Sequence, residues 1–277
     1  MSPQTERDRQ SLELEAAVHV VCQRADLRPR VAIILGSGLG GLADRIEHST
    51  CIPFGDIPGF GTSSASGHRG QLILGELEST QVVVMAGRIH RYEGWSNDQV
   101  AFPVRLMAAI GCERLIVSNA AGGVSPKLGV GDIVVIRDHI NMMGGRTNWD
   151  QDRHVPALTR QGDLYDSAMS RVAMEVAVGK QFSAYEGTYL ATLGPTYETR
   201  SEYRMMRRIG ADVVGMSTVP EVLAAARVNL RVLGLSMVSN VANPDRPLKA
   251  DHAEVLEAGR RAEVKMEAIV RGVLRSV

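Results

Sequence analysis

The chain has 277 residues, of which 44% are hydrophobic, and its 31 Lys and Arg residues are balanced by 31 Asp and Glu residues. A sequence of this length and composition can bury a large core, and its zero net charge argues against nucleic acid or an anionic membrane as a partner. The three cysteines, Cys22, Cys51 and Cys112, form no CxxC pair, so we expect neither a disulfide framework nor structural zinc.

The beginning of the chain is polar and charged and lacks the apolar stretch of a signal peptide, and no apolar run is long enough to cross a membrane. We therefore expect a cytoplasmic protein without a membrane partner.

Short apolar runs rich in β-branched residues recur along the chain and predict strands. They lie at 31–35, 71–74, 82–86, 115–118, 133–136, 189–193, 212–214 and 232–238. Terminal helices are predicted over 11–25 and 251–276, and capping signals at Ser96, Thr199 and Asp251 predict further helix starts.

This alternation predicts an α/β fold: a single domain over residues 1–277 with a central mixed, largely parallel β-sheet flanked by helices. Within it, residues 1–30 are expected to form an N-terminal helical extension. Segments 141–163 and 243–250 lack periodicity and are rich in Gly, Pro, Asn and charged residues, so we expect mobile loops there.

A glycine-rich loop follows the first predicted strand. Gly36, Gly38 and Gly41 match G-x-G-x-x-G, and Asp56 lies twenty residues after Gly36, a spacing typical of dinucleotide binding. The helix that fits before the next apolar stretch is too short for a βαβ unit, so an NAD-dependent oxidoreductase is only a distant alternative. A glycine loop at a helix N-terminus also suits an anion, to which Ser37 would add a hydroxyl.

The stretch Gly87–Gly94, which reads GRIHRYEG, follows the strand predicted at 82–86. If it stays extended, Arg88, His90 and Tyr92 point the same way. A guanidinium beside an imidazole and a phenol is a good receptor for an oxyanion with a polar ligand next to it. A solvated loop that happens to carry charges explains this stretch equally well on its own.

Small or polar residues follow the later predicted strands. The run SNAAGG at 118–123 would let a ligand approach the main chain. Ser217 misses the nucleophile elbow because Val219 stands where glycine is needed, so it is better placed as a hydroxyl donor at a helix N-terminus. Glu198 lies in a predicted turn, and Asn240 follows a strand. His68 and His252 fit a ligand site as well as an ordinary loop or helix-capping position. Metal-binding spacings are absent from the sequence, so we expect no metal.

Nine segments together closely resemble the trimeric, low-molecular-mass purine nucleoside phosphorylases. They are GSGLGGL (36–42), GHRG (67–70), GRIHRYEG (87–94), SNAAGG (118–123), GDIVVIRDHIN (131–141), GPTYET (194–199), VGMSTVPE (214–221), SN (239–240) and DHAEVL (251–256). The match is collinear from about residue 31 to the last predicted helix.

The resemblance implies the nucleoside phosphorylase fold and phosphorolysis of purine nucleosides to the free base and ribose 1-phosphate. It implies a homotrimer, no cofactor, and inorganic phosphate as co-substrate. Matching positions imply a phosphate site of Ser37, His68, Arg88, His90, the Ala120 backbone N–H and Ser217. They imply ribose contacts from Tyr92, Met216 and His252, and base contacts from Tyr197, Glu198, Asn240 and Val255, with His90, Glu198 and Asn240 as the catalytic residues.

The same resemblance implies base selectivity. Asn240 would hydrogen-bond purine N7 and the 6-oxo group, and Glu198 would accept from N1–H, which favours inosine and guanosine over adenosine. A xanthosine-preferring phosphorylase would keep Asn240 and remains an alternative, whereas a 5′-methylthioadenosine phosphorylase usually has aspartate there. A non-catalytic nucleoside-binding protein would need no Arg88 and His90 pair.

The chain departs from the family pattern in three places. Tyr197 stands where the family has Phe, and Ser239 where it has Thr. The segment from which an aromatic side chain usually reaches a neighbouring subunit's sugar pocket is shortened and rewritten, with Trp149 and His154 as candidates.

Overall fold

The computed structural model describes residues 3–36, 39–62, 69–144, 163–241 and 252–276. Within these ranges nine strands form one sheet in the order β2-β3-β4-β1-β5-β8-β7-β6-β9. Their bounds are β1 (Val31–Leu35), β2 (Glu47–Pro53), β3 (Gln71–Leu77), β4 (Thr80–Ala86), β5 (Arg114–Gly123), β6 (Ile133–Asn141), β7 (Ala184–Ala191), β8 (Val213–Gly215) and β9 (Arg231–Val241).

The sheet closes on itself at one end. β9, the last strand in the order, also pairs with β5, so that β5, β8, β7, β6 and β9 form a closed circuit of hydrogen-bonded neighbours. Five of the nine pairings are parallel and the others, β2–β3, β3–β4, β5–β8 and β6–β9, are antiparallel. The prediction of a mixed, largely parallel sheet is confirmed.

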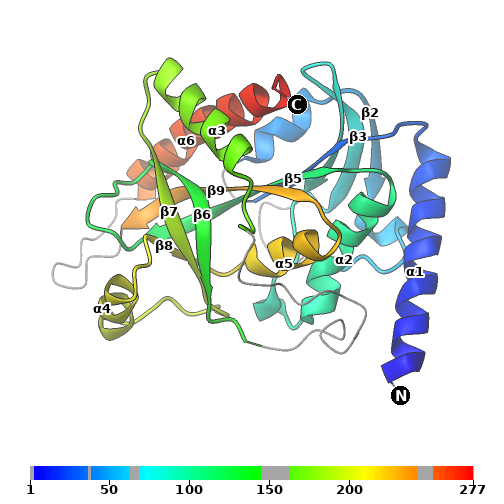
Figure 1. The fold of residues 1–277 in the computed structure, drawn as a ribbon, viewed down its shortest axis with the longest axis horizontal. Helices are drawn as coiled ribbons and strands as arrows, with labels where there is room; N and C mark the ends of the chain where they lie inside the picture. Colours follow the sequence, from blue (N-terminus) through cyan, green and yellow to red (C-terminus); the bar gives the residue numbers. More distant parts are fainter. Residues whose placement is uncertain (1–2, 37–38, 63–68, 145–162, 242–251, 277) are drawn as a thin grey trace.

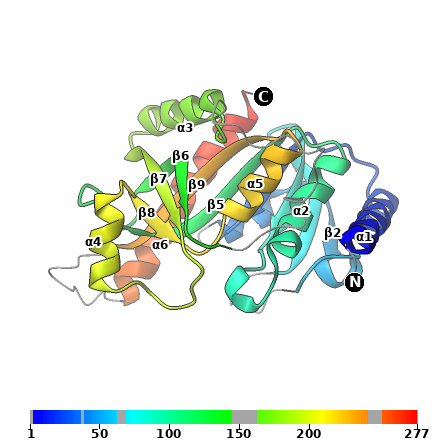
Figure 2. The same ribbon diagram turned by 60° about the horizontal axis from the view of Figure 1, so that its bottom comes forward.

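Helices cover both faces of this sheet, as Figures 1 and 2 show. α3 (Ser167–Gly179) and α6 (His252–Leu274) pack together on one face. α2 (Asn97–Ala109) and α5 (Val219–Arg227) pack together on the other, with α1 (Pro3–Arg24) outside α2. α4 (Arg200–Arg208) lies beyond β8 at one end of the molecule.

Alternation along the strands explains how one sheet serves two cores. In β1, Ala32 and Ile34 pack into the core under α1, α2 and α5, while Val31, Ile33 and Leu35 pack into the core under α3 and α6. All five are buried, which is the continuous apolar pattern of a strand covered on both faces. The sheet is therefore a rigid platform for the loops at its ends.

The helix starts follow from capping. Ser96 accepts a hydrogen bond from the Gln99 backbone N–H, and the Gln99 side chain accepts one from the Ser96 N–H. Thr199 and Glu202 make the same reciprocal pair at the start of α4, and Gly210 (φ 91°) follows the end of α4. The signals at Ser96 and Thr199 were predicted; the capping signal at Asp251 lies outside the described residues.

Several predicted boundaries were wrong. β5 does not end at residue 118 but runs to Gly123, and β9 runs to Val241, so residues 118–123 and Ser239–Asn240 lie within strands and not after them. β7 lies at 184–191 and not at 189–193, and β2 was not predicted. The helix expected after the glycine loop is the 3₁₀ segment η1 (Gly40–Arg45). Most of 141–163 and all of 243–250 lie outside the described residues.

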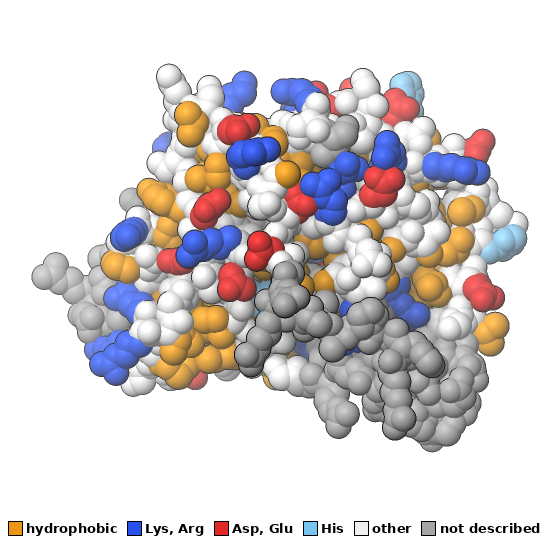
Figure 3. All heavy atoms as spheres, viewed as in Figure 1, with side chains coloured by type: hydrophobic (Ala, Val, Ile, Leu, Met, Phe, Trp, Pro, Cys, Tyr) orange, Lys and Arg blue, Asp and Glu red, His pale blue; other side chains and the backbone are white. Residues whose placement is uncertain are grey.

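Charged side chains of both signs are interspersed over the face seen in Figure 3, and hydrophobic side chains gather at its lower left, over the segment that leads into α4. In the segment between β7 and α4, Leu193 and Tyr197 are exposed to 42% and 79%. Among the helices of the described residues, none is both long and apolar enough to span a membrane.

Candidate active site

A cavity of about 270 Å³ lies where the carboxyl ends of several strands meet. Gly36 follows β1, the segment 88–92 follows β4, Asn119–Gly122 end β5, and Ser239 and Asn240 lie near the end of β9. Ligands of open α/β sheets bind at such a place, because strand ends deliver loops and helix N-termini to one point. The segment 214–217, at β8 and before α5, completes the wall.

The cavity brings together nine residues that the sequence singled out. They are Arg88, His90, Tyr92, Ala120, Tyr197, Glu198, Met216, Ser217 and Asn240. Ser37 and His68 lie outside the described residues. His252 and Val255 lie in the first turns of α6, for which the structure describes the backbone alone.

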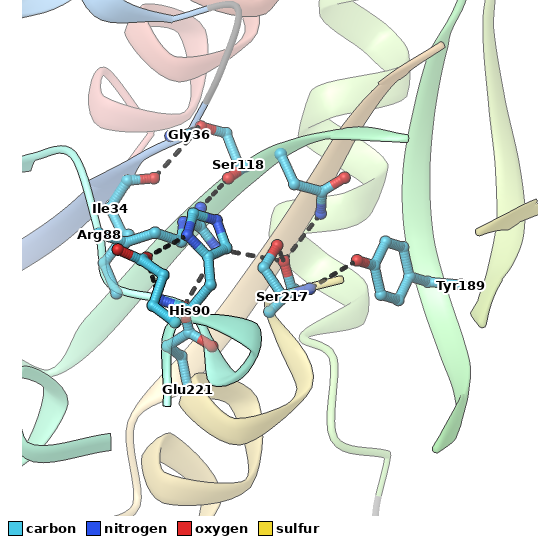
Figure 4. Close-up of polar contacts among 11 residues, drawn as sticks. Ile34, Gly36, Arg88, His90, Ser118, Tyr189, Ser217 and Glu221 are labelled. Carbon is cyan, nitrogen blue, oxygen red and sulfur yellow. Dashed lines mark hydrogen bonds and ion pairs between the residues drawn. The ribbon is translucent and has the colours of Figure 1, made fainter. Parts of the chain in front are cut away.

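Arg88 is the charged anchor of the cavity wall and is only 2% exposed. Its Nη1 lies 3.1 Å from Oε1 of Glu221, which is equally buried, and 3.3 Å from Oγ1 of Thr218. Its Nη2 donates to the backbone oxygen of Ser118. Figure 4 shows these groups converging from β5, the loop after β4 and the start of α5. The guanidinium is therefore fixed before any ligand arrives, which reduces the ordering cost of binding an anion.

Glu221 supplies the buried countercharge. Burial raises the pKa of its carboxyl group, and the neighbouring Arg88 opposes that rise. Glu221 also lies in the first turn of α5, where the helix dipole favours a negative charge. Removing one partner of such a pair would leave an uncompensated charge in the core.

His90 is held by Glu93. One carboxylate oxygen of Glu93 lies 3.0 Å from His90 Nδ1 and accepts from the His90 backbone N–H at 2.8 Å. The ring stacks on Tyr92 with 4.8 Å between ring centroids. Burial is the main cause that raises the pKa of Tyr92, so its phenol keeps its proton.

The expectation of a fully extended loop was wrong at residues 91–93, which form the 3₁₀ turn η3 (Arg91–Glu93). Even so, Arg88, His90 and Tyr92 line one cavity. Arg91 is not among the lining residues; its Nη1 donates to the backbone oxygen of Trp95.

Glu198 and Asn240 stand at another part of the same cavity. Glu198 accepts from the Thr192 hydroxyl at 3.1 Å, and Tyr203 of α4 also contacts it. Burial and Glu198 together raise the pKa of Tyr203. Asn240 Oδ1 accepts from the Ser239 hydroxyl at 2.9 Å, which orients the amide. This part of the wall offers a carboxylate and an amide, the groups that read the edge of a heterocyclic base.

The glycines around the cavity allow close packing of the main chain. A Cβ on Gly36 would overlap the Ser118 carbonyl oxygen, and a Cβ on Gly122 would touch both Val214 and Asn240. The Gly41 N–H, which the sequence offered to an anion, instead donates to Glu263 of α6 at 2.7 Å.

Several residues that line the cavity or support its wall were not assigned a role from the sequence. The cavity also contains Asn119 and Tyr203, and the supporting network contains Glu221, Thr218 and Ser118. Asn119, Thr218 and Glu221 stood inside quoted segments. The available signal for Glu221 was a glutamate beside the apolar run VLAAA, which points to a buried charge. Tyr203 gave no such signal.

Residues 30–275 match the model of the Phosphorylase superfamily, and that match makes the chain an α/β protein of this class. Within it, the chain belongs to the purine nucleoside phosphorylase family. Purine nucleoside phosphorylase 1 of Geobacillus stearothermophilus is 43% identical, over 95% of this chain and 97% of that protein.

Solved structures agree with this assignment. The purine nucleoside phosphorylase of Schistosoma mansoni in complex with inosine superposes with a TM-score of 0.85 at 36% identity, and the two chains cover 96% of each other. A structure of Schistosoma mansoni purine nucleoside phosphorylase in complex with adenosine gives a TM-score of 0.84 at 38% identity, covering 95% of this chain and 96% of that one.

Proposed function

We propose that this chain cleaves purine nucleosides with inorganic phosphate, giving the free base and ribose 1-phosphate, and that it prefers 6-oxopurines. The observation that carries the proposal is one cavity with two chemically different parts. Arg88, His90 and Ser217 offer positive charge and a hydroxyl, whereas Glu198 and Asn240 offer a carboxylate and an amide. A phosphate and a purine need these two environments, with a sugar between them.

At the phosphate part, Arg88, His90, Ser217 and the Ala120 backbone N–H bind the oxyanion, with Ser37 and His68 as further candidates. Phosphate then attacks the anomeric carbon on the face opposite the base. As the glycosidic bond breaks, the ribose becomes oxocarbenium-like, and the bound anion stabilises that charge. An enzyme nucleophile is not needed, because holding phosphate and nucleoside together supplies the proximity.

At the base part, the leaving purine gains negative charge. Asn240 donates to N7 and interacts with the 6-oxo group, while Glu198 accepts from N1–H and Tyr197 stacks on the ring with Val255 nearby. Tyr92, Met216 and His252 hold the ribose. A 6-aminopurine lacks the N1–H donor and leaves Glu198 poorly paired. Because a relative was solved with adenosine, family membership by itself does not supply this preference.

The assay for the reaction is cleavage of inosine, guanosine, xanthosine, adenosine and 5′-methylthioadenosine, each with and without phosphate. We expect phosphate-dependent cleavage of inosine and guanosine. Cleavage without phosphate, or none of any nucleoside, contradicts the proposal. Preference for xanthosine or 5′-methylthioadenosine would keep the reaction and replace the substrate.

Asn240→Ala tests the base part separately. We expect turnover of inosine to fall by about 10²-fold or more, because the amide acts on charge that develops as the base leaves, while the Kd for phosphate changes little. Steady-state kinetics and calorimetric titration with phosphate measure the two quantities. Unchanged turnover would remove Asn240 from the mechanism.

We also propose a homotrimer, with inorganic phosphate as co-substrate and no cofactor or metal, acting in the cytoplasm. The exposed Leu193 and Tyr197 support an interface near the cavity, and three free thiols support a reducing compartment. Light scattering checks the assembly: a mass three times that of the chain is expected, and the mass of one chain contradicts it.

A further inference from the structure

The strained residue Thr218 lies directly behind the phosphate part of the cavity. Its backbone has φ 74° and ψ −48°, and the Val219 N–H donates to the Ser217 carbonyl oxygen two residues back at 2.8 Å. This is a γ-turn of the rare type with positive φ, which is costly for any side chain and most of all for a β-branched one. Thr218 is also fully buried.

The Thr218 hydroxyl does not cap the helix, although a threonine at an N-cap position usually does. Thr218 is the N-cap of α5, but its side chain makes no capping hydrogen bond. Instead its Oγ1 lies 3.3 Å from Arg88 Nη1, 2.9 Å from Asn119 Nδ2 and 3.2 Å from Ser217 Oγ. The strained turn thus aims one hydroxyl at three neighbours, and all three line the cavity.

The donor and acceptor capacity of these groups determines to which atom each hydroxyl donates its hydrogen. A guanidinium can only donate, and the Asn119 amide nitrogen can only donate. Together they occupy the two lone pairs of Thr218 Oγ1, so the Thr218 hydrogen must go to Ser217 Oγ. Ser217 Oγ then accepts, and its own hydrogen is available for the cavity.

The rest of Ser217 is already committed to the protein. Its carbonyl oxygen accepts from Val219, and its N–H donates to the Tyr189 phenol at 3.3 Å. Tyr189 is itself fully buried, and burial keeps its pKa above the usual value, so the phenol stays protonated beside the Ser217 side chain. The phenol also makes a side-chain hydrogen bond with Ser217. Because the phenol keeps its own hydrogen, it can donate to Ser217 Oγ, and the Ser217 hydroxyl hydrogen is then the group that Ser217 offers to a ligand.

We infer that Thr218 is a positioning residue of the phosphate site: its strained γ-turn and its hydroxyl orient Ser217 as a hydrogen-bond donor to the oxyanion. The same hydroxyl holds the side chains of Arg88 and Asn119 in place beside Ser217. Thr218 does not line the cavity and so acts through these neighbours. The inference rests on the proposed phosphate site and adds a residue for which that proposal has no role.

Kinetic variants separate this role from a purely structural one. We expect Thr218→Val to raise the KM for phosphate about tenfold, the effect of one lost buried hydrogen bond, and to change the KM for inosine less than about twofold. Thr218→Ser keeps the hydroxyl and should restore the phosphate KM. Ser236→Ala, which removes another fully buried hydroxyl outside the cavity lining, is the matched control and should leave both constants unchanged.

Thr218→Gly covers the case in which Thr218→Val fails to fold, because glycine adopts positive φ without strain. Thr218→Gly should show the same phosphate defect whatever its stability. If the KM for phosphate rises in proportion to each variant's loss of thermal stability, and not with the loss of the hydroxyl, the inference is overturned.

A double variant tests the path through Ser217. In a Ser217→Ala background, removing the Thr218 hydroxyl should raise the phosphate KM by less than about threefold, because its main recipient is gone. A full tenfold effect there, or an unchanged phosphate KM in Thr218→Gly, would overturn the inference. If the wild-type chain neither binds phosphate in calorimetry nor requires it for cleavage, the proposed function itself fails and the inference falls with it.

Discussion

The imidazole of His90 takes its orientation from Glu93 and from its stacking on Tyr92. Glu93 bonds both the backbone and the ring of His90 and is itself buried, with its side chain 6% exposed. A ring held in this way has one fixed plane, and it presents the same face to each ligand that enters.

Glu93→Ala should therefore impair phosphate use more than nucleoside binding. We expect the kcat/KM for phosphate to fall about tenfold, the effect of a lost charge-assisted hydrogen bond. Glu93→Gln keeps an acceptor for Nδ1 and should lose much less. Equal losses in the two variants would mean that the charge of Glu93, and not its hydrogen bonds, matters.

Residues with distinctive chemistry at or just after strand ends were predictable from the sequence. Arg88, His90 and Asn240 each follow or end an apolar strand, and the structure places them around one cavity. Thr218 and Glu221 were not predictable as site residues, because a Ser-Thr-x-Pro-Glu stretch reads as an ordinary helix start. Their roles depend on contacts with Arg88, which lies 130 residues or more away in the chain.

At the scale of elements, the β3–β4 hairpin is tied to α6 by charge. Glu78 sits in the turn between the two strands and accepts from Arg271 at 2.6 Å and from Arg275 at 2.7 Å. The two guanidinium groups lower the pKa of Glu78 to about 2. A carboxyl group with a lowered folded-state pKa stabilises the fold above its unfolded pKa.

Glu78→Gln should accordingly lower stability at neutral pH. The difference from wild type should be complete above about pH 4.5 and should shrink as the pH falls toward 2, where the folded-state carboxyl also protonates. Urea unfolding at several pH values measures it, and Glu47→Gln, an exposed glutamate in β2, is the control. A difference that grows on acidification would contradict this account.

Strand positions were easier to predict than strand ends. Buried runs such as β1 were visible because all their residues are apolar. The continuation of β5 through SNAAGG was not, since small residues are typical of turns and the pairing with β9 and β8 keeps them extended. β2 was not predicted because its residues are mostly exposed and polar.

At the scale of the molecule, the cavity joins segments from β1 to β9, so a ligand should stabilise the whole fold. Phosphate at 100 times its Kd should add about 2.7 kcal/mol to the free energy of unfolding, a rise in Tm of about 5–10 °C for a chain of this size. Differential scanning calorimetry measures the shift. Potassium chloride at matched ionic strength is the control, and an equal shift there would mean a general salt effect.

The closed circuit of strands has a consequence for how copies of the chain can meet. At the other end of the strand order, β2 has no strand of the described residues beyond its outer edge. That edge is interrupted: the register shifts between Glu47 and Thr50, His48 has φ 49°, and Pro53 ends the strand. Such an edge is a poor template for adding another chain's strand. The irregular β2 edge therefore protects this end of the sheet from pairing with a strand of another copy.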